Sequence, residues 1–537
     1  MNANSAGPHA PPLRRGVHLL PVLAARGRAL TATAILAGLA AIKLIAQFAG
    51  IARYGFFRDE LYYMACGQHL AWGYVDQPPL IALVAWFERH AFGNSLVSIR
   101  LLPVLTGAAV VFLTGILARE LGAKRYGQFL AASAILWAPA YFAFDSFLSM
   151  NAFEPLFWLL GAWIVVRIVK GASPKWWLAF GAVAGIGLEN KHTMLVFGFA
   201  LVAGLSLAGQ WRLLVSKWVL IGGAIALALF FPNLLWEARH GWPQIEVVRN
   251  AQLYKNIPIS PLRFLSDQIL FLSPIALPVW VGGLAWLFFA PKAKLFRFLG
   301  VAYAIVLAVF IVLDGKSYYL LPAYPILMAA GGVAIEDLVE AKPWRWLRTT
   351  LPTLPTLLVI AGLVALPFGV PVLPVNAFLR YSRILPYANS VKTERDAVGV
   401  QLPQLYADMF GWENIADGVA QVYDDLPAAD RAGCAILAGN YGEAGAIDYY
   451  GSALGLPRAI SGHNAYFDWG PREYTGSCVI IFGERSSDYI RYFRDVHLAA
   501  TITNAHTMAV ESSINVYVCR QPTAPLSVLW PHFKMII

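Results

Sequence analysis

Long apolar stretches constrain the fold of this chain more than any other feature of its sequence. About eleven stretches between residues 29 and 371 are apolar enough to be membrane-spanning helices, which need roughly 20 such residues each. Of the 537 residues, 58% are apolar and only 13% are charged. Soluble domains carry about one quarter charged residues, so this chain needs lipid as its solvent. The stretches are 29–50, 97–117, 126–144, 152–170, 176–190, 192–209, 213–232, 265–289, 297–313, 318–336 and 350–371.

The basic residues predict which side of the membrane each loop faces. They gather in the N-terminal segment 1–28 and in short loops that all fall on one side of the predicted helices. Loops rich in lysine and arginine stay cytoplasmic, so the charge of +10 indicates helix orientation rather than a nucleic-acid partner. We predict a multi-pass protein of the inner cell membrane with a cytoplasmic N-terminus and an uncleaved first helix. The residues are Arg14, Arg15, Arg26, Arg28, Lys124, Arg125, Arg167, Lys170, Lys175, Arg212, Lys217, Lys292, Lys294, Arg297, Lys342, Arg345 and Arg348.

The opposite, extracytoplasmic side receives the longer polar segments. These include the first outer loop, 51–96, and everything beyond about residue 375. Residues 376–537 contain short apolar runs bounded by Gly, Asn or Asp, which are typical of buried strands, and helical patterns at 441–451 and 488–494. The predicted fold class is therefore an α-helical polytopic membrane domain over 29–375, followed by an extracytoplasmic α/β domain over 376–537.

The four cysteines show no pattern that indicates a metal site or a disulfide framework. Cys66, Cys434, Cys478 and Cys519 lie far apart, without a CxxC motif or a nearby histidine cluster. The last three fall on strand-like segments. We therefore predict that they are buried thiols.

The first outer loop carries the most informative residues. It reads Tyr54-Gly-Phe-Phe-Arg-Asp59-Glu60-Leu-Tyr62-Tyr63, and then Gly73-Tyr-Val-Asp76-Gln77-Pro-Pro-Leu80. Carboxylates placed just outside the hydrocarbon boundary must be solvated, paired or functional. Both a functional site and a solvated loop fit the pattern taken by itself.

Three other outer turns carry ionisable residues at a similar depth. A lone lysine at the end of a span is usually a snorkelling anchor. Together, however, these turns bring acidic groups, lysines and tyrosines to one membrane face. That combination suits a site that binds an anion while a carboxylate acts as a base. The turns are Asn151-Ala-Phe-Glu154-Pro155, Glu189-Asn190-Lys191-His192 and Asp314-Gly-Lys316-Ser-Tyr318-Tyr319.

These motifs resemble those of the GT-C glycosyltransferases, in the branch that contains protein O-mannosyltransferases and lipid A aminoarabinose transferases. The specific part of the resemblance is the first-loop motif at 59–80. The segments 190–193, 236–242 and 316–325 are similar to segments of the same branch, although each is weak by itself. The resemblance covers roughly residues 29–340, which is the membrane domain in outline.

The resemblance implies that a sugar is transferred, with inversion, from a polyprenyl phosphate to an acceptor hydroxyl at the extracytoplasmic face. The acceptors of this branch include glycolipids, cell-surface glycans and proteins. The family pattern places the general base at Asp59, which would take the proton of the acceptor hydroxyl. Lys191, Lys316 and Tyr319 would then bind the lipid phosphate. Glu154 falls where relatives carry Asp-Pro, a position linked to metal or donor binding.

The other candidate residues have both functional and structural interpretations. Glu60 is assigned to catalysis beside Asp59, although a helix cap fits it equally well, and the alternative for Asp59 itself is a structural ion pair with Arg58 or Arg53. The family often has Lys or His at the position of Gln77, so this chain departs from the pattern there. For His240 the alternative is packing between tryptophans. Donor or acceptor contacts are assigned to Tyr62, Tyr63, Asp76, Gln77, Glu154 and His240.

Other classes of function account for less of the sequence. A secondary transporter would carry ionisable groups near the membrane midplane, whereas only Lys43 lies well inside a predicted span. A transporter or flippase of a lipid-linked sugar is nevertheless the alternative function. No cofactor is required by the sequence, and a divalent metal at Glu154 stays open. The expected partners are a polyprenyl-phosphate-linked sugar, its acceptor and membrane lipids, with no nucleic acid.

Overall fold

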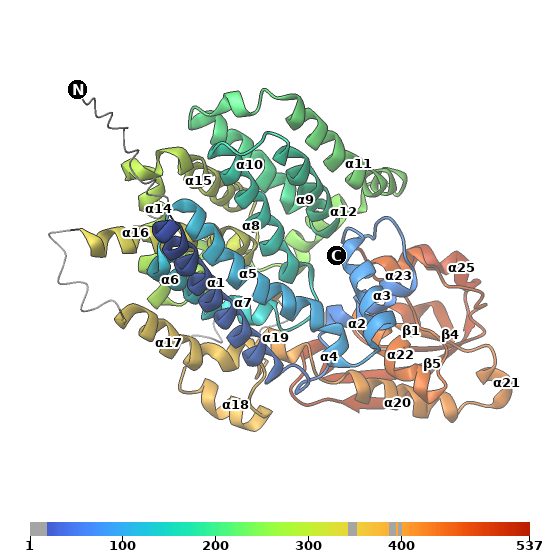
Figure 1. Ribbon diagram of the computed structural model, residues 1–537. Coiled ribbons are helices and arrows are strands. Elements are labelled where there is room, and N and C mark those ends of the chain that lie inside the picture. The colour runs from blue at the N-terminus through green and yellow to red at the C-terminus, as the bar shows by residue number, and fades with distance from the viewer. Residues whose placement is uncertain (1–18, 342–351, 386–393, 396–399) are drawn as a thin grey trace, which may run out of the picture.

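The computed structural model describes residues 19–341, 352–385, 394–395 and 400–537, with side chains described from Leu30 onward. Helices fill one part of the molecule and a small sheet fills the other (Figure 1). Of the basic residues used to predict orientation, Arg14, Arg15 and the loop at 342–348 lie outside the described residues.

Each predicted apolar stretch contains a helix, which confirms a helical multi-pass membrane domain. In the described chain, six helices are long and apolar enough to cross a membrane, or seven if α13 and α14, bent by 95°, form one span. The predicted number of eleven spans is not confirmed, because helices such as α10 and α17 are apolar but shorter. The helices are α1 (Leu19–Phe48), α5 (Leu101–Leu121), α6 (Arg125–Leu136), α7 (Pro139–Phe144), α8 (Met150–Val169), α9 (Trp176–Asn190), α10 (Thr193–Leu207), α11 (Lys217–Arg239), α13 (Pro261–Leu272), α14 (Leu277–Phe289), α15 (Arg297–Val312), α16 (Tyr324–Glu340) and α17 (Thr353–Gly369).

Glycines allow several of these helices to approach closely. A Cβ atom on Gly181 of α9 would lie 2.1 Å from the carbonyl oxygen of Gly222 on α11. A Cβ atom on Gly283 of α14 would lie 2.1 Å from the Leu327 oxygen of α16. Small residues at such crossings are typical of membrane helix packing, where van der Waals contact replaces the hydrophobic effect.

One ion pair is buried within the helical part. The Lys43 ammonium on α1 lies 2.8 Å from the Asp145 carboxylate at the end of α7, and donates to the Tyr141 carbonyl at 2.9 Å. Both side chains are almost completely buried. Lys43, the single lysine inside a predicted span, therefore makes a structural contact between two helices.

The C-terminal part is an α/β domain, as predicted. Its sheet has the strand order β2-β1-β3-β5-β4, in which β2, β1 and β3 are parallel and β5 and β4 are antiparallel to their neighbours. The strands are β1 (Ala435–Ala438), β2 (Ile460–Ser461), β3 (Cys478–Phe482), β4 (Phe493–Thr503) and β5 (Ser513–Pro522). The helix predicted at 441–451 is α22 (Tyr441–Tyr450). The helix predicted at 488–494 is present in part, because α24 (Ser486–Tyr489) and the 3-10 helix η10 (Ile490–Tyr492) cover 488–492 and β4 begins at Phe493.

The prediction of free thiols was wrong for two of the cysteines. Cys434 and Cys478 form a disulfide, while Cys66 and Cys519 are free and buried. The pairing follows from the sheet register, because Ala435 of β1 lies opposite Val479 of β3 and the two cysteines directly precede them. Cysteines 44 positions apart could not be paired from spacing alone.

The first outer loop forms helices that pack on the C-terminal domain (Figure 1). These are α2 (Arg58–Gln68) and α3 (Leu80–Phe92), and side chains of both share one apolar core with the sheet and α22. Gly442 and Gly445 of α22 face α2, where added Cβ atoms would lie 2.4 Å from the Arg58 side chain and 3.0 Å from Leu61. A segment near the start of the chain is therefore held by a domain near its end.

Removing one partner of the buried pair should destabilise the protein. We expect Asp145→Ala to cost about 3–5 kcal/mol, because the Lys43 ammonium is left buried without a counter-charge. Thermal unfolding in detergent would show a lower midpoint. The double variant Lys43→Met/Asp145→Ala should recover much of the loss, and a single variant as stable as the wild type would contradict the structural role of the pair.

Candidate active site

The N-terminus of α2 positions Asp59. The Arg58 amide donates to the Asp408 carbonyl at 3.0 Å, and the Phe57 amide donates to the Glu60 carboxylate at 2.8 Å. A carboxylate in the first turn of a helix is favoured by the helix dipole. The Asp59 side chain is 29% exposed, so it is reachable from a neighbouring space while its backbone is fixed.

The buried side chain of Glu60 holds this turn in place. Its fully buried carboxylate accepts hydrogen bonds from Arg100 Nε and Nη2, at 2.9 and 2.7 Å, and from the Leu148 amide at 2.9 Å. Arg100 also donates to two carbonyls of the 51–55 segment. The geometry therefore supports the capping interpretation of Glu60, whose side chain fixes the turn that carries Asp59. Glu60 does not line the cavity onto which Asp59 opens.

Asp59 opens onto a cavity of about 300 Å³ whose lining is partly apolar and partly polar. We call the polar part, where Arg58 contacts Asp59 and Glu394, the polar end of the cavity. The apolar lining comes from α7, α13, α17 and their flanking turns, and includes Phe144, Phe147, Leu270, Phe271, Ala365 and Phe368. The polar lining includes Arg58, Asp59, Asn151, Lys255, Glu394 and Tyr441. Such a space suits a ligand with a charged head and an apolar tail.

A second cavity, of about 540 Å³, lies beside the first. Arg58, Lys255 and Tyr441 line both cavities. The Tyr441 hydroxyl donates to Asp59 Oδ1 at 2.9 Å. The remaining lining is mostly polar and includes Arg485 and Lys534. Asp59 therefore lies next to the wall between an amphipathic space and a polar one.

Positive charge gathers at the polar end of the first cavity. The Glu394 carboxylate accepts hydrogen bonds from Lys316 Nζ at 2.9 Å, Gln404 Nε2 at 2.8 Å and Arg58 Nη2 at 3.3 Å, and Lys255 Nζ lies 3.8 Å away. Burial alone would raise the pKa of Glu394, but the three cations outweigh it and hold that pKa well below its usual value. We call these four side chains, Arg58, Lys255, Lys316 and Gln404, the anion site.

The structure also brings together Lys191, Glu154 and Tyr319, which the sequence had placed on three separate turns. Lys191 Nζ donates to Glu154 Oε2 at 2.9 Å and to Asn151 Oδ1 at 2.8 Å, and lies 4.3 Å from the centre of the Tyr319 ring. Asn151 lines the Asp59 cavity, so this cluster adjoins it. Glu154 is already neutralised by Lys191, and no group of three His, Cys, Asp or Glu side chains in the described residues could hold a metal.

Comparison with known proteins supports the same fold. The family model of the dolichyl-phosphate-mannose-protein mannosyltransferases matches residues 76–236. The crystal structure of ArnT from Cupriavidus metallidurans bound to undecaprenyl phosphate superposes with a TM-score of 0.59 at 15% sequence identity, over 89% of this chain and 97% of that one. Apo ArnT gives a TM-score of 0.59 at 14% identity, over 92% and 98% of the two chains. No curated protein sequence matches the chain.

The chain has the GT-C fold. The likeness to ArnT extends over both the helical part and the sheet domain, because it covers about nine tenths of the chain. The resemblance inferred from the first-loop motif is thus confirmed.

The second half of the first-loop motif joins α2 to the C-terminal domain. Asp76 Oδ1 accepts from the Tyr62 hydroxyl at 2.7 Å, and Oδ2 accepts from Asn464 Nδ2 at 3.1 Å. The Tyr62 hydroxyl also accepts from the Ala465 amide at 3.2 Å. Burial raises the pKa of Asp76 to about 6, and the hydrogen bond from Tyr62 offsets part of that effect. These contacts favour a positioning role for Tyr62 and Asp76.

Three other predicted contacts lie away from the lining of the Asp59 cavity. Tyr63 and Gln77 are buried, and Gln77 Nε2 contacts the Cys66 sulfur at 3.6 Å. His240 is exposed and stacks on Trp236 with ring centres 4.0 Å apart, as its packing interpretation requires. The structure does not bring these residues to the cavity at Asp59.

Sequence reasoning missed Lys255, Glu394, Gln404 and Tyr441. They come from segments that carry no recognisable motif, and Tyr441 is 382 positions from its partner Asp59. The available signal was the pair Gly442 and Gly445 directly after Tyr441. Two glycines three positions apart on a helix indicate a close approach of another backbone, here that of α2.

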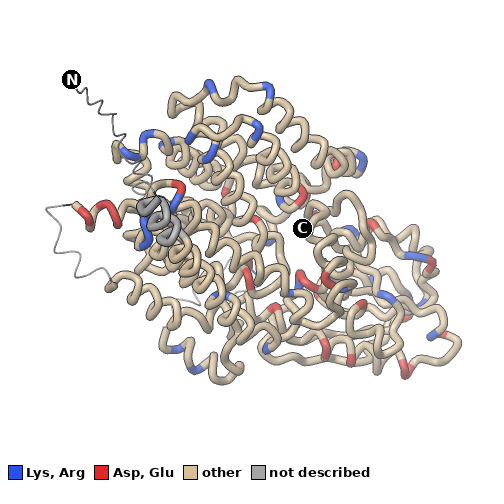
Figure 2. The backbone as a smooth tube through the Cα atoms, in the orientation of Figure 1, with Lys and Arg blue, Asp and Glu red and all other residues tan. Residues whose placement is uncertain are grey.

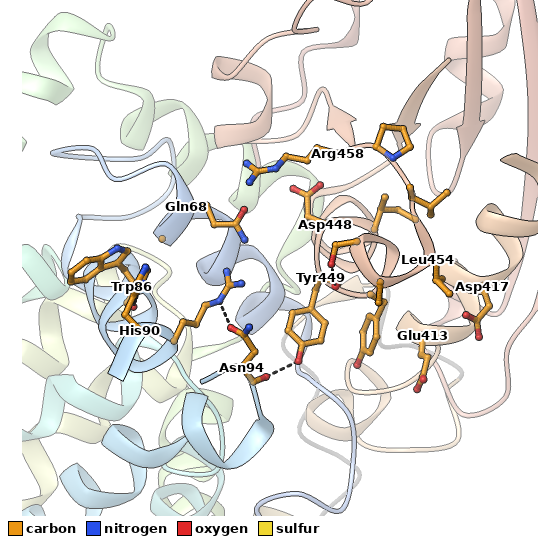
Figure 3. Close-up of a pocket in the computed structure, with 18 residues that line it drawn as sticks. Gln68, Trp86, His90, Asn94, Glu413, Asp417, Asp448, Tyr449, Leu454 and Arg458 are labelled. Carbon is orange, nitrogen blue, oxygen red and sulfur yellow. Dashed lines mark hydrogen bonds between the residues drawn. The ribbon is translucent and has the colours of Figure 1, made fainter. Parts of the chain in front are cut away.

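A larger cavity, of about 920 Å³, lies at the other end of α2 (Figure 3). In that view Gln68 and Arg458 approach it from one side, and Glu413 and Asp417 from the other. Gln68 is about 14 Å along the helix from Asp59, at 1.5 Å per residue. None of the candidate residues lines this cavity, although it is larger than the cavity at Asp59.

The raised pKa of Asp76 predicts a pH-dependent stability. In the unfolded chain this carboxyl titrates near its ordinary value of 3.8, and in the folded protein near 6, so the folded state binds the proton more tightly between these values. Relative to Asp76→Asn, the wild type should gain on the order of 2 kcal/mol as the pH falls from 7 to 4. Thermal unfolding midpoints across that range measure the shift. The exposed control Asp425→Asn should show the same pH dependence of the midpoint as the wild type. The same pH dependence in Asp76→Asn and the wild type would contradict the raised pKa of Asp76.

Proposed function

We propose that this protein is a membrane glycosyltransferase that transfers a sugar from a polyprenyl-phosphate-linked donor to an acceptor hydroxyl, with Asp59 as the general base. The observation that carries the proposal is the amphipathic cavity at Asp59. Its apolar end can take the first isoprene units of the donor, and its cationic end can take the phosphate. The undecaprenyl phosphate named with the ArnT structure has this chemistry.

The polar cavity supports a separate approach for the acceptor. It meets the donor cavity at Arg58, Lys255 and Tyr441, beside Asp59. An acceptor hydroxyl that enters from the polar side would reach the Asp59 carboxylate, which takes its proton as the hydroxyl oxygen attacks the anomeric carbon. The bond from that carbon to the phosphate oxygen breaks, and the anion site stabilises the charge left on the phosphate. A single displacement of this kind inverts the anomeric configuration.

Two observations support an extracytoplasmic location for the reaction. Disulfides such as Cys434–Cys478 persist mainly in oxidising compartments, and this one lies in the domain that closes over Asp59. Figure 2 shows Lys and Arg residues gathered along the edge of the helical part that faces away from the sheet domain. Such residues mark the cytoplasmic side.

The base assignment predicts a selective loss of turnover. Asp59→Asn removes the proton acceptor with almost no change in volume, so transfer from a polyprenyl-phosphate sugar should fall by about 10²–10⁴-fold. Binding of polyprenyl phosphate should change by less than about threefold. Asp314→Asn, at an exposed acid of an outer turn, serves as the matched control and should keep normal turnover. Near-normal transfer by Asp59→Asn would exclude Asp59 as the base.

A further inference from the structure

The polar end of the donor cavity already contains an anion, the carboxylate of Glu394. Its two oxygens are shared among donors from four separate parts of the chain, with Lys316 and Gln404 at 2.9 and 2.8 Å. Arg58 lies at 3.3 Å and Lys255 at 3.8 Å. The carboxylate is 7% exposed, so it is one of the groups that fill the polar end of the space.

The anion site offers more donors than one carboxylate uses, and its positive charge is shared by two further carboxylates, because Arg58 Nε also lies 3.7 Å from Asp408 and 3.9 Å from Asp59. Lys255 Nζ is too far from Glu394 for a hydrogen bond, and the Nε–H of Arg58 has no hydrogen-bond acceptor among the described residues. Arg58 is 12% exposed, so this donor is shielded from bulk water. A phosphate group presents more oxygens than a carboxylate and makes strong bonds with the same cations. The donor set therefore fits a phosphate more completely than it fits Glu394.

Glu394 also has a way to leave the site without a change in fold. Its backbone pairs with Asn256 as a single antiparallel bridge next to Lys255, so the backbone can stay in place. Rotation of the side chain alone would move the carboxylate away from Lys316. While no ligand is bound, this carboxylate offsets the mutual repulsion of the three cations, together with Asp59 and Asp408, which pair with Arg58.

We propose that Glu394 is a resident anion that occupies the phosphate position of the donor and exchanges with it. The inference rests on the proposed function, because it takes the donor phosphate as the competing anion. Exchange keeps the charge of the anion site nearly balanced in both states. It lowers the affinity for the donor phosphate, and return of the carboxylate after transfer favours release of the polyprenyl phosphate.

A purely structural role for Glu394 and the proposed exchange predict changes of opposite sign in phosphate affinity when Glu394 is neutralised. If the carboxylate only holds the cations in place while phosphate binds beside them, its neutralisation would disperse the cations and weaken binding. If phosphate must displace it, neutralisation strengthens binding. The sign of the change in affinity therefore separates the two roles.

The test compares Glu394→Gln with the wild type by titration of undecaprenyl phosphate into the detergent-purified full-length protein. We expect the variant to bind about five- to tenfold more tightly. Glu394→Asp, which keeps the charge but withdraws it from Lys316, should bind with intermediate affinity.

Glu120→Gln is the matched control, because Glu120 also bridges two cations, Arg167 and Lys170, far from the cavity. The affinity of this variant should equal that of the wild type. Inorganic phosphate and an undecaprenol without phosphate separate the contribution of the head group from that of the tail.

Tighter binding of undecaprenyl phosphate by Glu394→Gln, with no change for undecaprenol, supports the exchange. A gain with inorganic phosphate as well shows that the head group alone competes. Unchanged or weaker binding by the variant, with normal binding by the wild type, overturns the resident-anion role and leaves the proposed donor standing. Failure of wild type and variants alike to bind undecaprenyl phosphate overturns both.

Discussion

The buried ion pair between Glu60 and Arg100 is the contact on which the rest of the site depends. Both side chains are fully buried, and their two parallel hydrogen bonds leave a planar, rigid unit. That unit also binds carbonyls of the 51–55 segment and the Leu148 amide, so it joins the end of the first span to the turn before α8. Asp59 directly precedes Glu60 in the chain. A catalytic carboxylate is useful only if its position is fixed to within a fraction of an ångström, and here a neighbouring carboxylate fixes it.

The start of α2 is also where three environments meet. The helical part and the C-terminal domain both adjoin it, and residues of both line the amphipathic cavity. A lipid-linked sugar has its reactive carbon at the boundary between hydrocarbon and water. Since Asp59 lies at the polar end of a partly apolar cavity, the proposed base lies where that carbon would come to rest. The C-terminal domain supplies Tyr441, whose hydroxyl binds Asp59.

The sequence predicts this fold well where burial is uniform. Continuous apolar runs identified the membrane helices and strands such as β3, whereas β4 was missed because most of its side chains are exposed and polar residues interrupt its apolar ones. Asp59 and Lys316 could be found because they lie in motifs within short stretches of chain. Tyr441, Glu394 and the Cys434–Cys478 bond could not, because each depends on a tertiary contact that local periodicity does not encode.

Native mass spectrometry of the detergent-purified protein tests the central claim most directly, because it asks what the cavity at Asp59 carries. The account predicts that polyprenyl phosphate, or its sugar conjugate, remains bound, or that added synthetic polyprenyl phosphate binds with one-to-one stoichiometry. A conjugate would also reveal the mass of the transferred sugar. Retention of ordinary phospholipids alone, with no mass shift on addition of polyprenyl phosphate, would contradict the account and favour transport over transfer.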